Sequence, residues 1–335
     1  MLLCNGEIME LGFAWHHAKT PKHARADFED MINLNCNAVL IAASENDLDY
    51  WYPNMVEIID EAKSVGLKVW LNYWAFGGVF GGEPPSVFLH NNHNYRQKTA
   101  ESKEFVPAAC INAPEFRQHF HSVIEKTLSD MKIDGVFFDE PHYYLAFDIS
   151  EFTCTCDYCR SKFKNDYNTE MPLVYNDVID EFRKTSMLQF LTECCSKVKN
   201  INSSIETCVC VIPKAFETLG TPNWESILAI PEIDMFSTDP YYHIFGMDRE
   251  WAIKTAARTV DLAKKYGKKS QLWVQLFRIP NGEEESVSTL IPVYRDLGVD
   301  SIFGWSYLAN KGTSISSDNP DVLWKLVTDE YRRIT

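Results

Sequence analysis

The chain has 335 residues, 45% of them hydrophobic, and its 32 basic and 47 acidic side chains give a formal charge of −15. This acid excess, with no basic stripe, disfavours nucleic acid and anionic membranes as partners, whereas a neutral polar substrate is acceptable. No apolar run reaches 18 residues, and the first residues turn polar too early for a signal peptide. We therefore expect a cytoplasmic protein without a membrane anchor.

Apolar runs alternate with amphipathic segments along the whole chain, a pattern typical of βα units around a parallel sheet. Proline at Pro53 and Pro114 marks helix starts, and glycine at Gly66, Gly267 and Gly298 marks helix ends. The predicted strands span 8–15, 38–42, 68–73, 135–139, 205–211, 234–238, 271–276 and 301–305. The predicted helices lie near 22–34, 54–65, 114–131, 175–199, 223–230, 248–266, 283–297 and 320–333. Eight of each predicts an α/β fold, a single (β/α)8 barrel over residues 1–335.

Such a barrel typically needs about 250 residues, so the surplus must lie in loops. Long insertions at about 74–113 and 140–174 follow strands three and four, on the side where barrel enzymes carry their active sites. The alternative, an open doubly wound sheet, lacks its glycine-rich turn, because residues 12–17 read Gly-Phe-Ala-Trp-His-His. We therefore expect no organic cofactor.

Strand four ends in two adjacent carboxylates. Residues 134–142 read Asp-Gly-Val-Phe-Phe-Asp-Glu-Pro-His, an apolar run followed by Asp139, Glu140 and a proline. Two carboxyl groups at a strand exit divide proton donation from charge stabilisation, as cleavage of a glycosidic bond requires. Both reach one pocket only if the backbone turns directly after Phe138, since neighbouring strand residues face opposite sides. The alternative is a helix cap or a loop ion pair.

Three cysteines, Cys154, Cys156 and Cys159, lie within six residues of the second insertion. Such spacing presents several thiolates to one tetrahedral ion, and Cys110, at the end of the first insertion, is the best fourth ligand. Four thiolates leave no open coordination position, so the predicted zinc is structural. Free thiols are the alternative, and a disulfide would require an exported protein.

These residues together resemble the family 42 β-galactosidases. The resemblance covers residues 110–117 (Cys-Ile-Asn-Ala-Pro-Glu-Phe-Arg), the exit of strand four and the cysteine cluster, in that order. It implies a barrel glycosidase in which Glu140 is the general acid/base. The family's nucleophile is a glutamate at the end of strand seven, but residues 272–278 here read Leu-Trp-Val-Gln-Leu-Phe-Arg. The second carboxylate must therefore come from elsewhere.

Two candidates for that carboxylate remain. Asp239 ends strand six and is followed by Pro240 and two tyrosines, as strand four is followed by its own proline and aromatics. An arrangement resembling glycosidases of α-linked sugars makes Asp139 the nucleophile and Asp239 or Glu140 the acid. Alternatively, the Asp139–Glu140 pair resembles hexosaminidases in which the substrate's own acetamido group attacks. A cap or turn role for Asp239 is the structural alternative.

Saccharides need aromatic platforms and planar hydrogen-bonding groups, and the strand ends supply both. The predicted substrate-binding residues are Trp15, His16, Trp74, His142, Tyr241, Gln275 and Trp305. A metal site on His16, His17 and His142 is disfavoured because neither a helical pairing nor an acid triad supports it. No Gly-x-Ser-x-Gly elbow supports a serine hydrolase.

The leading hypothesis is a glycoside hydrolase acting on an oligosaccharide or glycoside. A substrate-assisted N-acetylhexosaminidase-type hydrolase and a catalytically silent carbohydrate-binding barrel remain as alternatives. A zinc-dependent hydrolase is weaker, because a four-thiolate site leaves no position for water.

Overall fold

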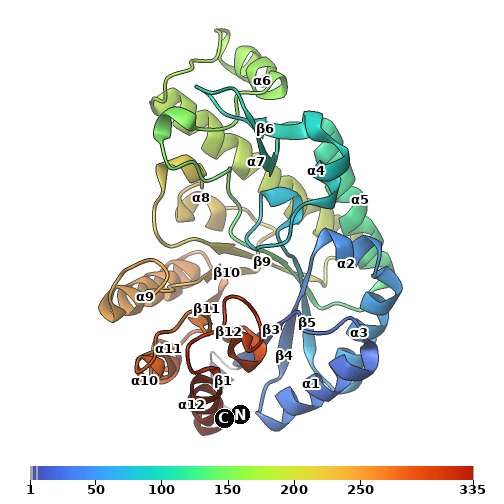
Figure 1. The fold of residues 1–335 in the computed structure, drawn as a ribbon, viewed down its shortest axis with the longest axis vertical. Helices are drawn as coiled ribbons and strands as arrows, with labels where there is room; N and C mark the ends of the chain where they lie inside the picture. Colours follow the sequence, from blue (N-terminus) through green and yellow to red (C-terminus); the bar gives the residue numbers. More distant parts are fainter. Residues whose placement is uncertain (1–2, 5–6, 335) are drawn as a thin grey trace.

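The computed structural model describes residues 3–4 and 7–334, and eight parallel strands close into a barrel (Figure 1). Around the barrel the strand order is β10-β11-β12-β3-β4-β5-β8-β9. The strands are β3 (Glu10–Trp15), β4 (Ala38–Ala43), β5 (Lys68–Tyr73), β8 (Gly135–Phe138), β9 (Glu206–Val211), β10 (Met235–Thr238), β11 (Lys269–Gln275) and β12 (Ser301–Trp305). The predicted (β/α)8 barrel is confirmed. The first strand begins later than predicted, because Ile8 pairs with Leu3 in a small antiparallel ladder of β1 (Leu3–Cys4) and β2 (Glu7–Ile8).

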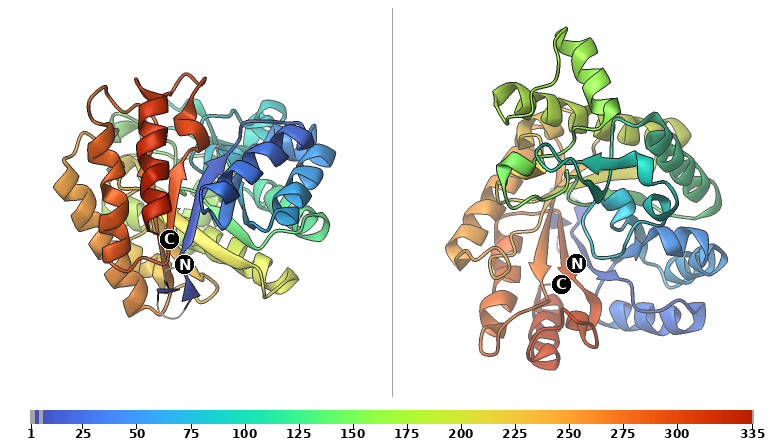
Figure 2. Two further views of the ribbon diagram at one scale, coloured as in Figure 1. Left: turned by 90° about the horizontal axis from the view of Figure 1, so that it is seen from below. Right: turned by 45° about the horizontal axis from the view of Figure 1, so that its top comes forward.

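Helices surround the strands on the outside, and Figure 2 shows them from two further directions. The principal ones are α1 (Pro21–Asn33), α3 (Tyr52–Ser64), α5 (Pro114–Asp130), α7 (Asp177–Ile201), α8 (Trp224–Leu228), α9 (Arg249–Lys265) and α12 (Pro320–Arg333). The helix predicted over 283–297 is two, α10 (Glu284–Ser288) and α11 (Leu290–Asp296). Pro292 explains the break, because a proline without an N–H is tolerated only in a first helical turn. No helix among the described residues is both long and apolar enough to cross a membrane.

Aromatic side chains fill the middle of the barrel, and charged side chains close it at the N-terminal ends of the strands. Trp70, Phe137, Trp273 and Phe303 form one buried cluster. Beneath them Lys68 forms ion pairs with Glu10 and Glu206, and the indole Nε1 of Trp70 donates to Glu10 at 3.1 Å. Because this end is closed by side chains, a ligand has access only from the C-terminal ends of the strands.

The two insertions carry elements of their own and pack against each other. The first contains α4 (Val87–Asn91) and the antiparallel pair β6 (Arg96–Lys98) and β7 (Phe105–Ala109), and the second contains α6 (Asp157–Tyr167). Figure 1 shows β6, α4 and α6 together in the upper part of the molecule. Buried Gln97 links them: its Oε1 accepts from the backbone N of Tyr144 at 3.0 Å and from Thr153 Oγ1 at 2.5 Å.

Close packing inside the barrel makes Gly135 sensitive to substitution. A Cβ at this position would lie 2.3 Å from the ring of Trp70. We expect Gly135→Ala to lower the free energy of unfolding by about 3 kcal/mol or more, at the upper end of overpacking costs, because the buried indole has no free space to move into. Urea unfolding measures the effect, with the exposed Ser203→Ala variant as control. An unchanged midpoint for Gly135→Ala would contradict this packing.

Candidate functional site

A cavity of about 460 Å³ opens at the C-terminal ends of the barrel strands. Seven of the ten side chains predicted to act in catalysis or substrate binding line it, from β5, β8, β10 and β12 or the loops that follow them. They are Trp74, Asp139, Glu140, His142, Asp239, Tyr241 and Trp305. The predicted carboxylates therefore share one cavity with aromatic rings.

The backbone turns directly after β8, and this turn brings Asp139 and Glu140 into the same cavity. Glu140 adopts a φ of +40°, a left-handed conformation that non-glycine residues rarely occupy. Hydrogen bonds hold the turn on both sides: the Gly81 N donates to the Asp139 carbonyl, and the Glu140 N donates to the Cys210 carbonyl, both at 2.9 Å. The β8 exit is thus anchored to the first insertion and to β9.

Asp139 is a half-buried residue of the cavity wall and accepts a hydrogen bond from one side chain. The Nδ2 of buried Asn72 donates to its Oδ2 at 3.0 Å. Burial and the nearby charge of Glu140 raise the pKa of Asp139 well above its ordinary value, while the Asn72 bond acts in the opposite direction. Asn72 therefore favours the ionised form of this carboxyl.

Asp239 is 3% exposed and follows the end of β10. Burial, then the charge of Glu140 and a hydrogen bond with its carboxyl, then the charge of Asp139, raise the pKa of Asp239 well above its usual range. Its Oδ2 has no hydrogen-bond partner among the described residues, and its Oδ1 lies 4.0 Å from the Cys210 thiol. This carboxyl is therefore stabilised in its protonated form.

Aromatic rings also line the cavity. The rings of Trp74 and Trp305 lie 6.0 Å apart with an interplanar angle of 57°, and Trp273 lies 5.9 Å from Trp305. Such rings are hydrophobic platforms for the C–H face of a sugar. His142 lies at the rim, where its Nδ1 is 2.5 Å from the Glu140 carbonyl.

Three predicted binding residues are not among those lining the cavity. The Trp15 Nε1 donates to Asp27 at 2.8 Å, and Gln275 donates to the Phe277 carbonyl at 2.9 Å. His16 stacks behind Trp74 at 5.0 Å, where burial and the neighbouring His17 lower its pKa to about 4. The polar or aromatic groups of these three residues hydrogen bond to, or stack on, other residues of the protein.

Sequence reasoning did not identify other wall residues, notably Glu83, Trp273 and Phe277. Every residue of β11 after Lys269 is buried. The two-residue periodicity of a strand would nevertheless have placed Trp273 on the face that points into the barrel. Glu83 comes from an irregular, glycine- and proline-rich loop for which no periodicity exists. Burial raises its pKa, with the charge of Glu140 acting in the same direction and Arg278 against it.

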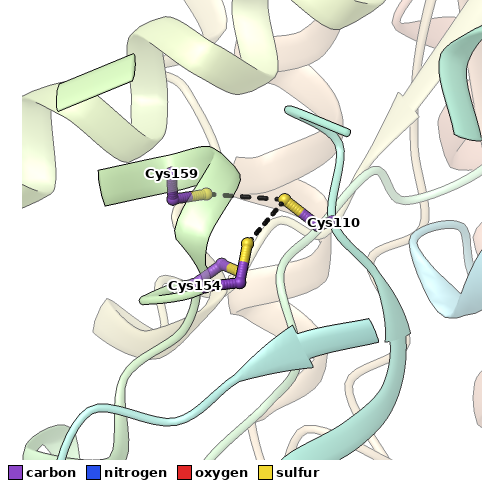
Figure 3. A group of neighbouring side chains, drawn as sticks. Cys110, Cys154 and Cys159 are labelled. Atoms are coloured by element: carbon purple, nitrogen blue, oxygen red, sulfur yellow. Dashed lines mark hydrogen bonds between the residues drawn. The ribbon is translucent and has the colours of Figure 1, made fainter. Parts of the chain in front are cut away.

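The four predicted metal ligands lie together (Figure 3). The sulfurs of Cys110, Cys154, Cys156 and Cys159 are all buried and lie within 4.8 Å of one another. Cys110 Sγ is 3.5 Å from Cys159 Sγ and 3.3 Å from Cys156 Sγ. Four thiolates about 2.3 Å from a tetrahedral zinc would lie about 3.8 Å apart, so the cluster has the size of such a site. All nine cysteines from Cys36 onward are free thiols.

The surroundings of the cluster also suit bound thiolates. The Nδ2 of Asn112 donates to Cys159 Sγ at 3.4 Å, and α6 begins at Asp157, directly after Cys156. Amide donors and a helix N-terminus both favour negative charge on sulfur. The residues present therefore fit a metal ion, and the cluster joins the two insertions.

No protein-family model and no curated protein matches the sequence. Among solved structures, a β-galactosidase from the Antarctic haloarchaeon Halorubrum lacusprofundi aligns with 97% of this chain at 12% identity and a TM-score of 0.74. A family 42 β-galactosidase from G. stearothermophilus aligns with 97% at 11% identity and a TM-score of 0.71. An endo-β-1,4-mannanase from Thermotoga petrophila aligns with 99% at 12% identity and a TM-score of 0.63.

The chain has the barrel fold of these glycoside hydrolases. The predicted resemblance to family 42 β-galactosidases is confirmed at the level of the fold. The chain spans 58% and 56% of the two galactosidases and 78% of the mannanase.

The raised pKa of Asp239 predicts a stabilising substitution. Below about pH 4 this carboxyl is protonated in both the folded and unfolded protein, so it costs no stability. As the pH rises, the unfolded chain ionises first and the folded protein loses stability until the raised pKa is passed. We therefore expect Asp239→Asn to raise the melting temperature relative to the wild type more at pH 8 than at pH 4.5.

Melting curves at both pH values measure this difference, with Asp261→Asn on the exposed face of α9 as the control. A variant that is destabilised more at pH 8 than at pH 4.5 would show that Asp239 is held as a carboxylate.

Proposed function

We propose that the protein is a glycoside hydrolase that cleaves a glycosidic bond in the cavity formed by Asp139, Glu140 and Asp239. The observation that carries this proposal is the convergence of these three carboxyl groups on a cavity walled by Trp74 and Trp305. Glycosidic cleavage requires one carboxyl that donates a proton and one that stabilises or attacks the anomeric carbon. The barrel fold shared with β-galactosidases and a mannanase supports this class by analogy.

The environments of the two aspartates support different roles. Burial and the charge of Glu140 raise the pKa of both aspartates, but the hydrogen bond from Asn72 opposes this rise at Asp139, so we assign Asp139 as the nucleophile or charge stabiliser. Asp239 has no such donor on its Oδ2, and its raised pKa favours the protonated form, so we assign it as the general acid. Glu140 occupies the acid/base position implied by the family 42 resemblance and is the alternative proton donor.

The aromatic rings suit the other part of the substrate. A sugar ring that lies against Trp74 and Trp305 would have its C–H face on an apolar surface and its polar edge free for hydrogen bonds. In this pose the glycosidic oxygen would face the carboxyl groups of β8 and β10.

Removing the proposed carboxyls tests the class of function. We expect Asp139→Asn to lower kcat/KM for aryl glycosides by at least about 10³-fold, because this carboxylate stabilises or attacks the anomeric centre. Hydrolysis of an aryl glycoside panel measures the loss, and Asp261→Asn is the matched control away from the cavity. Wild-type protein that binds a saccharide without any product would favour the catalytically silent barrel.

Substrates with different leaving groups distinguish the general acid from the nucleophile. A dinitrophenyl leaving group needs no protonation, so loss of the general acid affects its cleavage far less than that of an alkyl glycoside. We expect Asp239→Asn to retain most activity on dinitrophenyl glycosides and to lose activity on methyl glycosides, whereas Asp139→Asn loses both. The same pattern in Glu140→Gln, with Asp239→Asn inactive on both substrates, would transfer the acid role to Glu140.

We also propose that the four-cysteine cluster holds a structural zinc ion. Cys110, Cys154, Cys156 and Cys159 would be its ligands, and the bound ion would cross-link the two insertions. Because four thiolates close the coordination sphere, we assign the ion no catalytic step.

Zinc removal should therefore act on stability before activity. We expect chelation, or Cys154→Ser, to lower the melting temperature by several degrees while activity persists at temperatures where the protein stays folded. Metal analysis, melting curves and glycoside assays on the same samples measure this, with Cys194→Ala, a buried thiol of α7, as control. Activity lost on chelation while the fold is intact would identify a catalytic metal instead.

A further inference from the structure

A second cavity of about 440 Å³ adjoins the carboxylate cavity. It is formed mainly by the insertion after β5 and includes Arg96, the first residue of β6. The two cavities share Gly82, Glu83 and His142 as wall residues. We call this second space the Arg96 cavity.

The guanidinium of Arg96 has N–H donors that are not all hydrogen-bonded within the protein. Its Nη2 donates to the Leu89 carbonyl at 3.1 Å. The Nε is shielded from solvent and has no hydrogen-bond partner among the described residues. A buried N–H donor without a partner is rare in proteins and requires an explanation, such as a bound ion or ligand.

Arg96 forms no ion pair with a carboxylate among the described residues, although an acidic side chain lines the same cavity. Among the described residues that line it, Glu83 is the one acidic side chain. The charges that act on Glu83 are those of Arg278 and Glu140, not that of Arg96. The chain has 47 acidic side chains, so a lack of acidic residues does not explain why Arg96 has no carboxylate partner.

Two glycines lie between or beside the two cavities. Gly82 has a φ of +131°, and a Cβ there would lie 2.3 Å from the Trp74 indole. At Gly81 a Cβ would lie 2.7 Å from Glu140 Oε2. Both positions therefore exclude side chains, and this part of the wall is bare backbone between the carboxyl groups and the Arg96 cavity.

We propose that the Arg96 cavity binds an oxyanion, a carboxylate or sulfate group, carried by the saccharide whose glycosidic bond lies in the carboxylate cavity. The Nε and a neighbouring Nη of an arginine form a planar two-pronged donor that matches such a group. The inference rests on the proposed glycosidase function and narrows its substrate to acidic glycans, uronate-containing or sulfated.

Binding measurements test this without requiring turnover. Isothermal titration of D-glucuronate, sodium sulfate and neutral D-glucose is compared for wild type, Arg96→Gln, Arg96→Lys and the control Arg295→Gln on the outer helix α11. We expect at least one anion to bind the wild type about tenfold more tightly than glucose. Arg96→Gln should abolish this preference, Arg96→Lys should keep part of it, and Arg295→Gln should keep all of it.

Selective binding of glucuronate would identify a uronate site, whereas sulfate binding of equal or greater strength would identify a sulfate ester site. No preference for either anion in the wild type would overturn the proposal, as would a preference that survives in Arg96→Gln. Arg96→Lys preserves the charge and serves as the test if Arg96→Gln does not fold.

A glycoside assay on the same samples separates the two proposals. Arg96-dependent anion binding without any glycoside hydrolysis would refute the glycosidase and leave the oxyanion site. Hydrolysis of neutral glycosides without anion preference would refute the oxyanion site alone.

Discussion

The candidate site depends on the backbone turn that directly follows β8. In a continuing strand Asp139 and Glu140 would face opposite sides, and only one carboxyl would reach the cavity. The left-handed conformation of Glu140 brings both to the same side, at a cost of about 1–3 kcal/mol for an unfavourable backbone conformation. Hydrogen bonds from Gly81 to Asp139 and from Glu140 to Cys210 hold the turn, so three segments of the chain together determine its geometry.

The first insertion can hold that turn only because it is itself fixed to the second. Gln97 joins the two through two hydrogen bonds, and the thiols of Cys110, Cys156 and Cys159 meet between them. These contacts fix the first insertion, which contains the glycine-rich segment that borders the carboxylate cavity. The buried polar and sulfur groups of the two insertions therefore support the turn indirectly, by packing one insertion against the other.

The sequence predicted the eight barrel strands well because each has its own periodicity. The errors lay at element ends, in the helix over 283–297 that is two helices, and in the insertions, whose short helices and strands were not predicted. The sequence also predicted that the thiols of residues 110 and 154–159 lie together, because the cysteine spacing and the adjacency of the two insertions can both be inferred from it. It did not predict which way side chains point at a strand end. Trp15 and Gln275 look like binding residues in sequence, but hydrogen bonds to Asp27 and to the Phe277 backbone occupy them. Glu83 was missed because an irregular loop has no periodicity.

The carboxyl groups of the cavity come from closely spaced strands of the barrel. β8 and β10 flank β9, so Asp139, Glu140 and Asp239 gather on one side, with the Cys210 thiol of β9 between them. β11 ends in Gln275, which does not line the cavity, whereas Trp74 after β5 and Trp305 at the end of β12 lie on either side of the carboxyl groups in the order of the strands. Burial, and then the charge of Glu140, raise the pKa of Asp239 and so favour its protonated form without any cation nearby. An acid and an ionised partner can therefore coexist on neighbouring strands, without the opposed glutamates of the family 42 arrangement.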